Sequence, residues 1–240
     1  MSLSAEIREE LLKNGASIVG FGDLKEISYE SRPGLDYGIS IALALNPEII
    51  NNINEGVTHE YHDEYNRANS KLDQLAILGA EILKKHGYKA IPQTVSKVVI
   101  DRTDHRTQLP HKTVATRSGI GWIGKCALLV TKDFGSAVRL TSVATDAALD
   151  TGEPINEARC GDCDRCVVNC PAKVVKGVNW DIEKKREDYY NAIDCRKEAR
   201  RRSGLAGIDQ SLCGLCILSC PYTQKYIESK NIIYRGKNIK

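Results

Sequence analysis

Apolar residues recur along the N-terminal part of the chain with two different periods, which indicates helices mixed with strands. Helical spacing runs over residues 4–14 and, in a longer stretch, over residues 58–86. Two short runs that are apolar on both faces, residues 16–21 and 38–45, are typical of buried strands. Pro47 then predicts the start of a short helix, because the first helical turn does not need its missing N–H group.

The middle of the chain carries weaker patterns. A strand is predicted at residues 97–100, and a short helix at residues 110–118 begins with a proline. Two β-rich runs, residues 127–131 and 137–144, are separated by the short segment 132–135, and this spacing predicts a hairpin.

A polar, turn-prone stretch from Asp150 to Pro154 predicts a boundary between two domains. Residues 1–150 would form an α+β domain with an apolar core of its own. Residues 151–240 contain eight of the nine cysteines, so we expect this domain to be held together by what the cysteines bind. A charged helix is predicted at residues 181–202.

The cysteines follow the spacing of ferredoxin-type iron–sulfur ligands. The run from Cys160 to Pro171 reads C-x-x-C-x-x-C-x-x-x-C-P, and the run from Cys213 to Pro221 reads C-x-x-C-x-x-x-C-P. The first ligand of the second run is displaced upstream to Cys195. In two-cluster ferredoxins the cysteine before the proline binds the other cluster. The predicted [4Fe–4S] ligand sets are therefore Cys160, Cys163, Cys166 and Cys220 for a first cluster, and Cys170, Cys195, Cys213 and Cys216 for a second.

Disulfides and zinc are the alternatives for these cysteines. Disulfides suit short secreted chains, but the N-terminus does not resemble a signal peptide. Zinc would use two C-x-x-C pairs and would leave Cys166, Cys170 and both Cys-Pro endings unexplained. Cys126 lies outside the two ligand sets and is predicted to be a buried, inert thiol.

The composition limits where the protein could act and what it could bind. No apolar run approaches the roughly 20 residues of a bilayer helix, so we expect no membrane span, and nine cysteines without an export signal predict the cytoplasm. From residue 151 onward, 17 Lys and Arg face 12 Asp and Glu, an excess that invites a nucleic-acid interpretation. Eight cluster thiolates would offset this excess, so charge alone does not predict nucleic-acid binding.

A glycine-rich turn, Gly119-Ile-Gly121-Trp-Ile-Gly124, matches the dinucleotide pattern G-x-G-x-x-G. That fingerprint requires a strand before the glycines and a helix after them. Here a helix-like segment precedes the turn and a β-rich run follows it, so the match does not predict a dinucleotide site.

The segment from His111 to Lys125, followed by Gly135-Ser136, Thr145-Asp146 and the spaced cysteines, resembles epoxyqueuosine reductase over roughly residues 40–225. That family is similar in build to reductive dehalogenases. The resemblance implies a nitroreductase-like N-terminal α+β domain that binds cobalamin, and a C-terminal ferredoxin-like domain that supplies its electrons. The family removes the epoxide oxygen from a modified tRNA base.

The same resemblance implies a cofactor site at the glycine turn. Its residues would lie in or beside the corrinoid pocket: Gly119, Gly121, Trp122, Gly124 and Lys125. The alternative is that the glycines only form a tight turn on which Trp122 packs.

A proton donor is also implied. Family members carry an acidic residue in a VDxxPxxER segment, and it is thought to donate a proton. Aligned without gaps from the glycine turn, its place falls on His105, with Asp104 adjacent, and the Glu-Arg positions become His111-Lys112. Asp101 looks like the motif but lies four residues too far away. Asp104 and His105 are the candidate general acids, and a solvated loop is the alternative.

The resemblance therefore implies an iron–sulfur oxidoreductase that receives electrons from ferredoxin or flavodoxin. Its substrate would be a small molecule or a modified tRNA base. Many family members carry a helical-repeat tail that grips tRNA, and this chain is expected to be a short form without it. The competing hypotheses are a flavin-dependent nitroreductase-like enzyme and a non-catalytic electron-transfer protein.

Overall fold

The computed structural model describes residues 1–94, 101 and 103–232. The strand predicted at residues 97–100 lies outside these residues. Contacts divide the chain into two compact units, each made of three segments. The first unit comprises Met1–Leu43, Ala68–Gly121 and Arg139–Ile155, and the second comprises Ala44–Arg67, Trp122–Val138 and Asn156–Lys240. The division at residue 150 remains a prediction.

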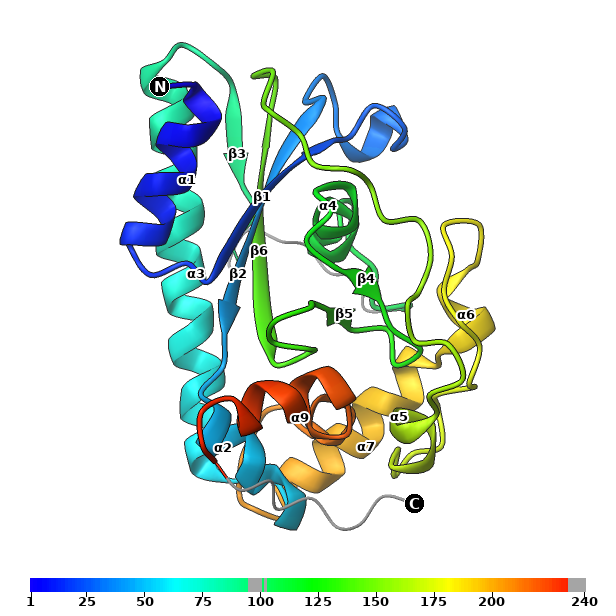
Figure 1. Ribbon diagram of the computed structural model, residues 1–240. Coiled ribbons are helices and arrows are strands. Elements are labelled where there is room, and N and C mark those ends of the chain that lie inside the picture. Colours follow the sequence, from blue (N-terminus) through cyan, green and yellow to red (C-terminus); the bar gives the residue numbers. More distant parts are fainter. Residues whose placement is uncertain (95–100, 102, 233–240) are drawn as a thin grey trace. The chain divides into compact units, whose positions relative to one another are not determined.

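A four-stranded sheet forms the centre of the first unit (Figure 1). The edge strand β1 pairs antiparallel with β2, and β3 pairs antiparallel with β6. The two strands predicted from apolar runs are confirmed, since β1 and β2 lie within two residues of the expected bounds. In spatial order the strands are β1 (Ile18–Asp23), β2 (Tyr37–Ala44), β6 (Val138–Thr145) and β3 (Ala90–Pro92).

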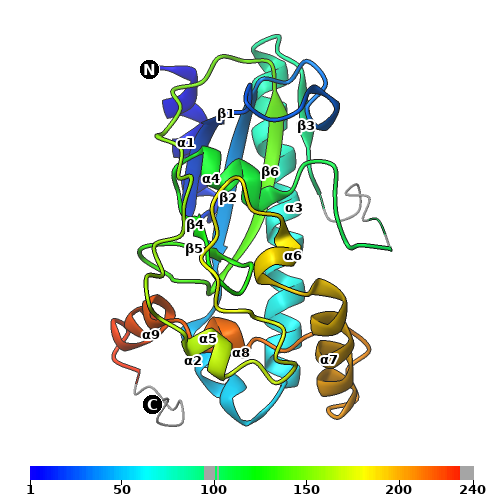
Figure 2. The same cartoon turned by 90° about the vertical axis from the view of Figure 1, so that its right-hand side faces the viewer.

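Helices cover both faces of this sheet (Figures 1 and 2). One face carries α1 (Leu3–Lys13) and the C-terminal part of α3 (His59–Lys85). At Gly79 of α3, a Cβ atom would lie 3.7 Å from Leu11, Ile39 and Val143, so this helix packs on α1, β2 and β6. The opposite face carries α4 (His111–Arg117). The helices predicted at residues 4–14, 58–86 and 110–118 are confirmed.

Glycines on β1 and β2 let α4 approach the sheet backbone closely. A Cβ atom at Gly22 would lie 2.9 Å from the Arg117 backbone, and one at Gly38 would lie 2.7 Å from Val114. Real Cβ atoms essentially never show such contacts. The missing side chains therefore fix the depth of α4 and the position where the glycine-rich turn begins.

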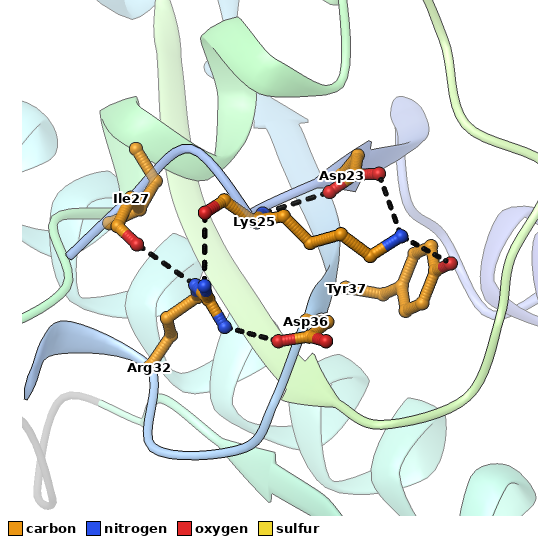
Figure 3. A network of polar contacts seen from close by, with 6 residues as sticks. All are labelled: Asp23, Lys25, Ile27, Arg32, Asp36 and Tyr37. Carbon is orange, nitrogen blue, oxygen red and sulfur yellow. Dashed lines mark hydrogen bonds and ion pairs between the residues drawn. The ribbon is translucent and has the colours of Figure 1, made fainter. Parts of the chain in front are cut away.

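A polar network closes the connection between β1 and β2 (Figure 3). The Arg32 guanidinium donates to two backbone carbonyl groups, each at 2.9 Å, and pairs with Asp36. The Lys25 ammonium group donates to the Tyr37 hydroxyl at 3.2 Å and pairs with Asp23 at 3.3 Å. The hydrogen bond to Tyr37, followed by the contacts with Asp23, raises the pKa of Lys25. These contacts fix a loop that contains one 3₁₀ turn, Tyr29–Ser31.

The second unit is mainly helical and contains the N-terminal part of α3. The Tyr226 hydroxyl donates to the Leu45 carbonyl at 3.1 Å, and the Phe134 and Tyr226 rings meet edge to face at 5.0 Å. In the described part of the chain, no helix is long and apolar enough to cross a bilayer. The unit's other elements are α2 (Pro47–Asn52), a 3₁₀ turn (Ile53–Glu55), β4 (Trp122–Ile123), β5 (Leu129–Val130), α5 (Arg165–Val168), α6 (Arg186–Tyr189), α7 (Ala192–Gly204), α8 (Leu215–Leu218) and α9 (Pro221–Glu228).

The hairpin predicted between residues 127–131 and 137–144 is wrong. The strand β5 pairs with β4, whereas β6 joins the four-stranded sheet. Thr131 and Gly135 close the intervening turn on itself, because the Thr131 N–H group donates to the Gly135 carbonyl at 2.8 Å. The turn therefore ends one β-ribbon and does not connect two paired strands.

The single helix predicted at residues 181–202 is also wrong. The chain forms α6 and α7, which are separated at Tyr190 in an extended conformation, with φ −156° and ψ 138°. Asn191 then caps α7 by accepting a hydrogen bond from the Asp194 N–H group at 3.1 Å. An Asn cap satisfies a helix N–H group that would otherwise lack a partner, so a new helix starts here.

Replacing Gly135 by alanine should lower the free energy of unfolding by about 3 kcal/mol. Gly135 has φ +56°, and a Cβ atom there would lie closer than 3.0 Å to the backbone of Thr223 at the start of α9. Urea unfolding followed by circular dichroism measures the loss. Gly207 is the matched control, because it has φ +71° and open space around it, so Gly207→Ala should cost only about 1 kcal/mol of backbone strain. Equal losses would contradict the steric explanation.

Candidate functional site

All nine cysteines belong to the second unit, and all are free thiols in this structure. Among the described residues, no group of three or more His, Cys, Asp or Glu side chains is arranged to hold a single metal ion.

Electrostatic interactions join cysteines that come from separate runs of the sequence. Cys220 lies close enough to Cys160 to interact electrostatically. Cys170 interacts with both Cys195 and Cys213. Each link joins cysteines of one predicted set, although the residues come from separate runs. The residues present thus fit two clusters with crossed ligation.

Cys126 occupies a position that its sequence context does not reveal. The thiol is buried, with 5% of the residue exposed, as predicted. Its side chain contacts Cys166 of the first set and Cys216 of the second. A small apolar core surrounds it, formed with Cys170, Val174 and Val175. Cys126 therefore lies between the two predicted ligand sets.

Backbone N–H groups converge on the Cys220 sulfur. The donors belong to Thr223 and Tyr222, in the first turn of α9, and to Ser136. Burial raises the pKa of Cys220, and these three donors act in the opposite direction because they favour the thiolate. Pro221 occupies the first turn without removing a needed donor. This geometry stabilises an anionic sulfur at a position that is otherwise poorly hydrated.

The second ligand set has different neighbours. Burial raises the pKa of Cys195, and a hydrogen bond from the Tyr190 hydroxyl opposes this effect. Burial also raises the pKa of Cys213, and the Leu215 N–H group opposes it. Both thiols need a bound metal to become thiolates at neutral pH, so cluster assembly would release protons.

The glycine-rich turn runs from α4 into β4, so it lacks the strand and helix order of a dinucleotide fingerprint, as predicted. Gly119 has φ +69°, and a Cβ atom there would lie 2.5 Å from the Glu153 carbonyl oxygen. Gly121 is the last residue of the first unit's middle segment, Ala68–Gly121. At Gly124, a Cβ atom would lie 3.7 Å from the Cys160 sulfur. Gly119 thus packs against the protein's own backbone, and Gly124 approaches the first ligand set.

Trp122 is buried, with 3% of its surface exposed. The Tyr222 ring meets it edge to face at 5.1 Å, and the Arg159 guanidinium lies 5.9 Å from its ring centre. The indole Nε1 atom has no hydrogen-bond partner among the described residues. A buried donor without an acceptor costs free energy, so Trp122 fits a bound group that supplies an acceptor.

Asp104 and His105 lie in a partly exposed loop of the first unit. The His105 N–H group donates to the Asp101 carbonyl at 2.8 Å, and Asp104 pairs with Arg106 at 3.2 Å. Hydrogen bonds from Thr103 lower the pKa of Asp101, whose side chain braces this turn. Asp104 and His105 therefore remain the candidate proton donors, and Asp101 has a structural role.

His111 lies in the first unit. From the sequence it was placed only by alignment, at the Glu position of the family's acidic segment. At the start of α4, its Nδ1 atom lies 2.9 Å from the Ser142 hydroxyl of β6. Burial, together with nearby Arg139, lowers the pKa of His111 to about 4. The imidazole is therefore neutral at physiological pH and ties α4 to the sheet.

Comparison with known proteins adds the family context. Residues 159–223 match the family described as a 4Fe-4S double cluster binding domain. The epoxyqueuosine reductase of Atelocyanobacterium thalassa is 31% identical over 131 residues, which cover 52% of this chain and 41% of that protein. The predicted resemblance is confirmed. The chain spans less than half the length of the curated epoxyqueuosine reductases that it matches.

Solved structures share the fold. The catabolic reductive dehalogenase NpRdhA superposes with a TM-score of 0.70 and 17% identity, covering 95% of this chain and 33% of that one. An epoxyqueuosine reductase solved with an epoxyqueuosine-modified tRNA stem loop superposes with a TM-score of 0.58 and 21% identity, covering 92% and 65%. The chain therefore has the mixed α/β fold of these enzymes, with a double-cluster domain.

Proposed function

We propose that this chain is an iron–sulfur oxidoreductase that passes single electrons through two [4Fe–4S] clusters to a corrinoid for reductive bond cleavage. One observation carries the proposal: residues 159–223, which contain the eight spaced cysteines, match a 4Fe-4S double cluster binding domain. A small ferredoxin or flavodoxin would supply the electrons. The first unit would be the nitroreductase-like part, and the protein would act in the cytoplasm.

The chain's residues divide this work between them. The two predicted ligand sets hold the clusters, and Trp122 offers its free indole N–H group to the corrinoid. When bound, a corrinoid supplies the one-electron chemistry that side chains lack. Asp104 or His105 delivers the proton that the cleaved product requires. His111 stays neutral above about pH 4, so it positions α4 and does not serve as an acid.

The proposed substrate is a modified tRNA base. The support is the name shared by the curated relatives and the tRNA stem loop bound in one structural neighbour. A second support is a reductive dehalogenase neighbour, whose structure is described as suggesting a mechanism for B12-dependent dehalogenation; this favours a corrinoid. An electrophoretic shift of epoxyqueuosine-containing tRNA that weakens with rising salt would support the substrate.

Cobalamin added to the anaerobically reconstituted chain should bind stoichiometrically and shift the corrin absorption spectrum. Trp122→Phe should weaken this binding about tenfold, because it removes a buried donor worth roughly one hydrogen bond. Titration by absorption or calorimetry measures both effects. The other tryptophan, Trp180, is also buried and provides the control, since Trp180→Phe should leave the affinity unchanged. Retention of flavin would favour the nitroreductase-like alternative, and retention of neither cofactor would favour an electron carrier.

A further inference from the structure

Lys125 is a buried cation in the second unit. Only 5% of the residue is exposed. Within the described residues, no carboxylate pairs with its ammonium group, whereas the group acts electrostatically on the Cys166 sulfur. Burying an uncompensated charge is costly, so proteins pair such a charge with an opposite one. A thiolate at Cys166 would supply a counter-charge for Lys125.

The residues beside Lys125 approach the same sulfur atoms. Gly124 packs near Cys160, at 3.7 Å from an added Cβ atom, and Cys126 contacts Cys166. Cys160 and Cys166 belong to the first ligand set. Gly124 and Lys125 thus lie beside the first ligand set, and Cys126 lies between the two sets.

Hydrogen-bond donors also reach cysteines of both ligand sets. Three backbone N–H groups converge on Cys220. In the second set, one N–H group reaches Cys213 and one hydroxyl reaches Cys195. Positive charge and donors at cluster sulfurs favour the reduced state, because reduction adds a negative charge.

A second cation, Arg202, lies near Cys213 of the second set. Its influence on this thiol is opposed by Glu198. Arg202 is also more exposed than Lys125, and water and ions screen exposed charges more strongly. The cation beside the first set is buried, whereas the one beside the second is more exposed. This difference favours a higher reduction potential for the first cluster.

We propose that Lys125 raises the reduction potential of the cluster held by Cys160, Cys163, Cys166 and Cys220 and makes it the electron-accepting end of the relay. This inference rests on the proposed function. With both clusters bound, one electron would pass from the reduced cluster of the second set to the oxidised cluster of the first. The Lys125 ammonium group compensates the added negative charge, and no proton moves.

The test is a redox titration of the anaerobically reconstituted full chain, followed by electron paramagnetic resonance. The unsubstituted chain should show two resolved one-electron steps. In Lys125→Gln, the ratio of reduced to oxidised higher-potential cluster should fall about tenfold at fixed potential, which equals 59 mV for one electron. The lower-potential cluster should move much less.

Two further variants serve as controls. Lys125→Arg keeps the charge and should stay close to the unsubstituted chain. Lys132 lies in the same unit but is exposed, so Lys132→Gln should move neither potential. Unresolved steps in the unsubstituted chain, an unchanged Lys125→Gln titration, or a shift confined to the lower-potential cluster would overturn the inference and leave the proposed function standing. A chain that binds no iron would overturn both.

Discussion

Cys195→Ala should reduce the iron bound by the anaerobically reconstituted chain from about eight atoms to about four per polypeptide. Cys195 lies on α7, outside both cysteine runs, and interacts electrostatically with Cys170 and Cys213. Without it, the second cluster would have three protein ligands and the first would keep four. Turnover should be lost altogether, because an interrupted relay delivers no electrons. Iron and sulfide analysis measures the cluster content, and paramagnetic resonance of the reduced protein counts the clusters.

Cys126→Ala is the matched control for this experiment. Cys126 is also a buried cysteine and contacts Cys166 and Cys216, but it belongs to neither ligand set. The variant should therefore keep about eight iron atoms. A Cys195→Ala chain that also keeps eight, or a Cys126→Ala chain that drops to four, would show that the ligand sets are assigned wrongly.

The sequence predicted correctly the elements that depend on interactions between residues close together in the chain. The helix at residues 58–86 is present as His59–Lys85, because its apolar stripe recurs at the helical period over many turns. Pro47 begins α2 as predicted, with Asn46 as the N-cap. The cysteine spacing identified the double-cluster segment that matches at residues 159–223. In each case the signal lies within one short stretch of chain.

Pairing between distant segments was not predictable in the same way. Residues 137–144 read as a strand, but β6 pairs with β3, where Ala90 lies opposite Thr145. The extended break at Tyr190 forms a bridge with Val175, a partner that helical patterning does not reveal. Strand composition indicates that a segment will pair but not which partner it will find.

The surroundings of the sulfur atoms were likewise hidden in the sequence. Ser136 reaches Cys220 from a distant turn, and Tyr190 reaches Cys195 across a helix break. Lys125 was linked by resemblance to a corrinoid pocket, whereas its burial and its effect on Cys166 appear only in three dimensions. Ligand spacing therefore indicates what is bound, and the fold determines how the bound group is tuned.

Removing the proton donor should lower turnover of an epoxyqueuosine-containing tRNA stem loop by about 10²- to 10⁴-fold without changing the iron content. Asp104→Asn and His105→Gln, made separately, identify which residue has this role. Both side chains lie in the partly exposed loop that Asp101 braces. Loss of a general acid slows the protonation step but leaves electron delivery intact. The clusters should therefore still be reduced at the same rate. Stopped-flow reduction of the clusters and single-turnover product analysis separate the two steps.

Asp101→Asn is the control in the same loop. Its amide oxygen can still accept the hydrogen bond from the Thr103 N–H group, which spans 2.7 Å in the parent chain. The loop should therefore keep its conformation, and turnover should stay within about twofold of the parent, as expected for a change that preserves the turn. If Asp104→Asn and His105→Gln both keep full turnover, neither residue is the proton donor, and a group outside this loop must supply the proton.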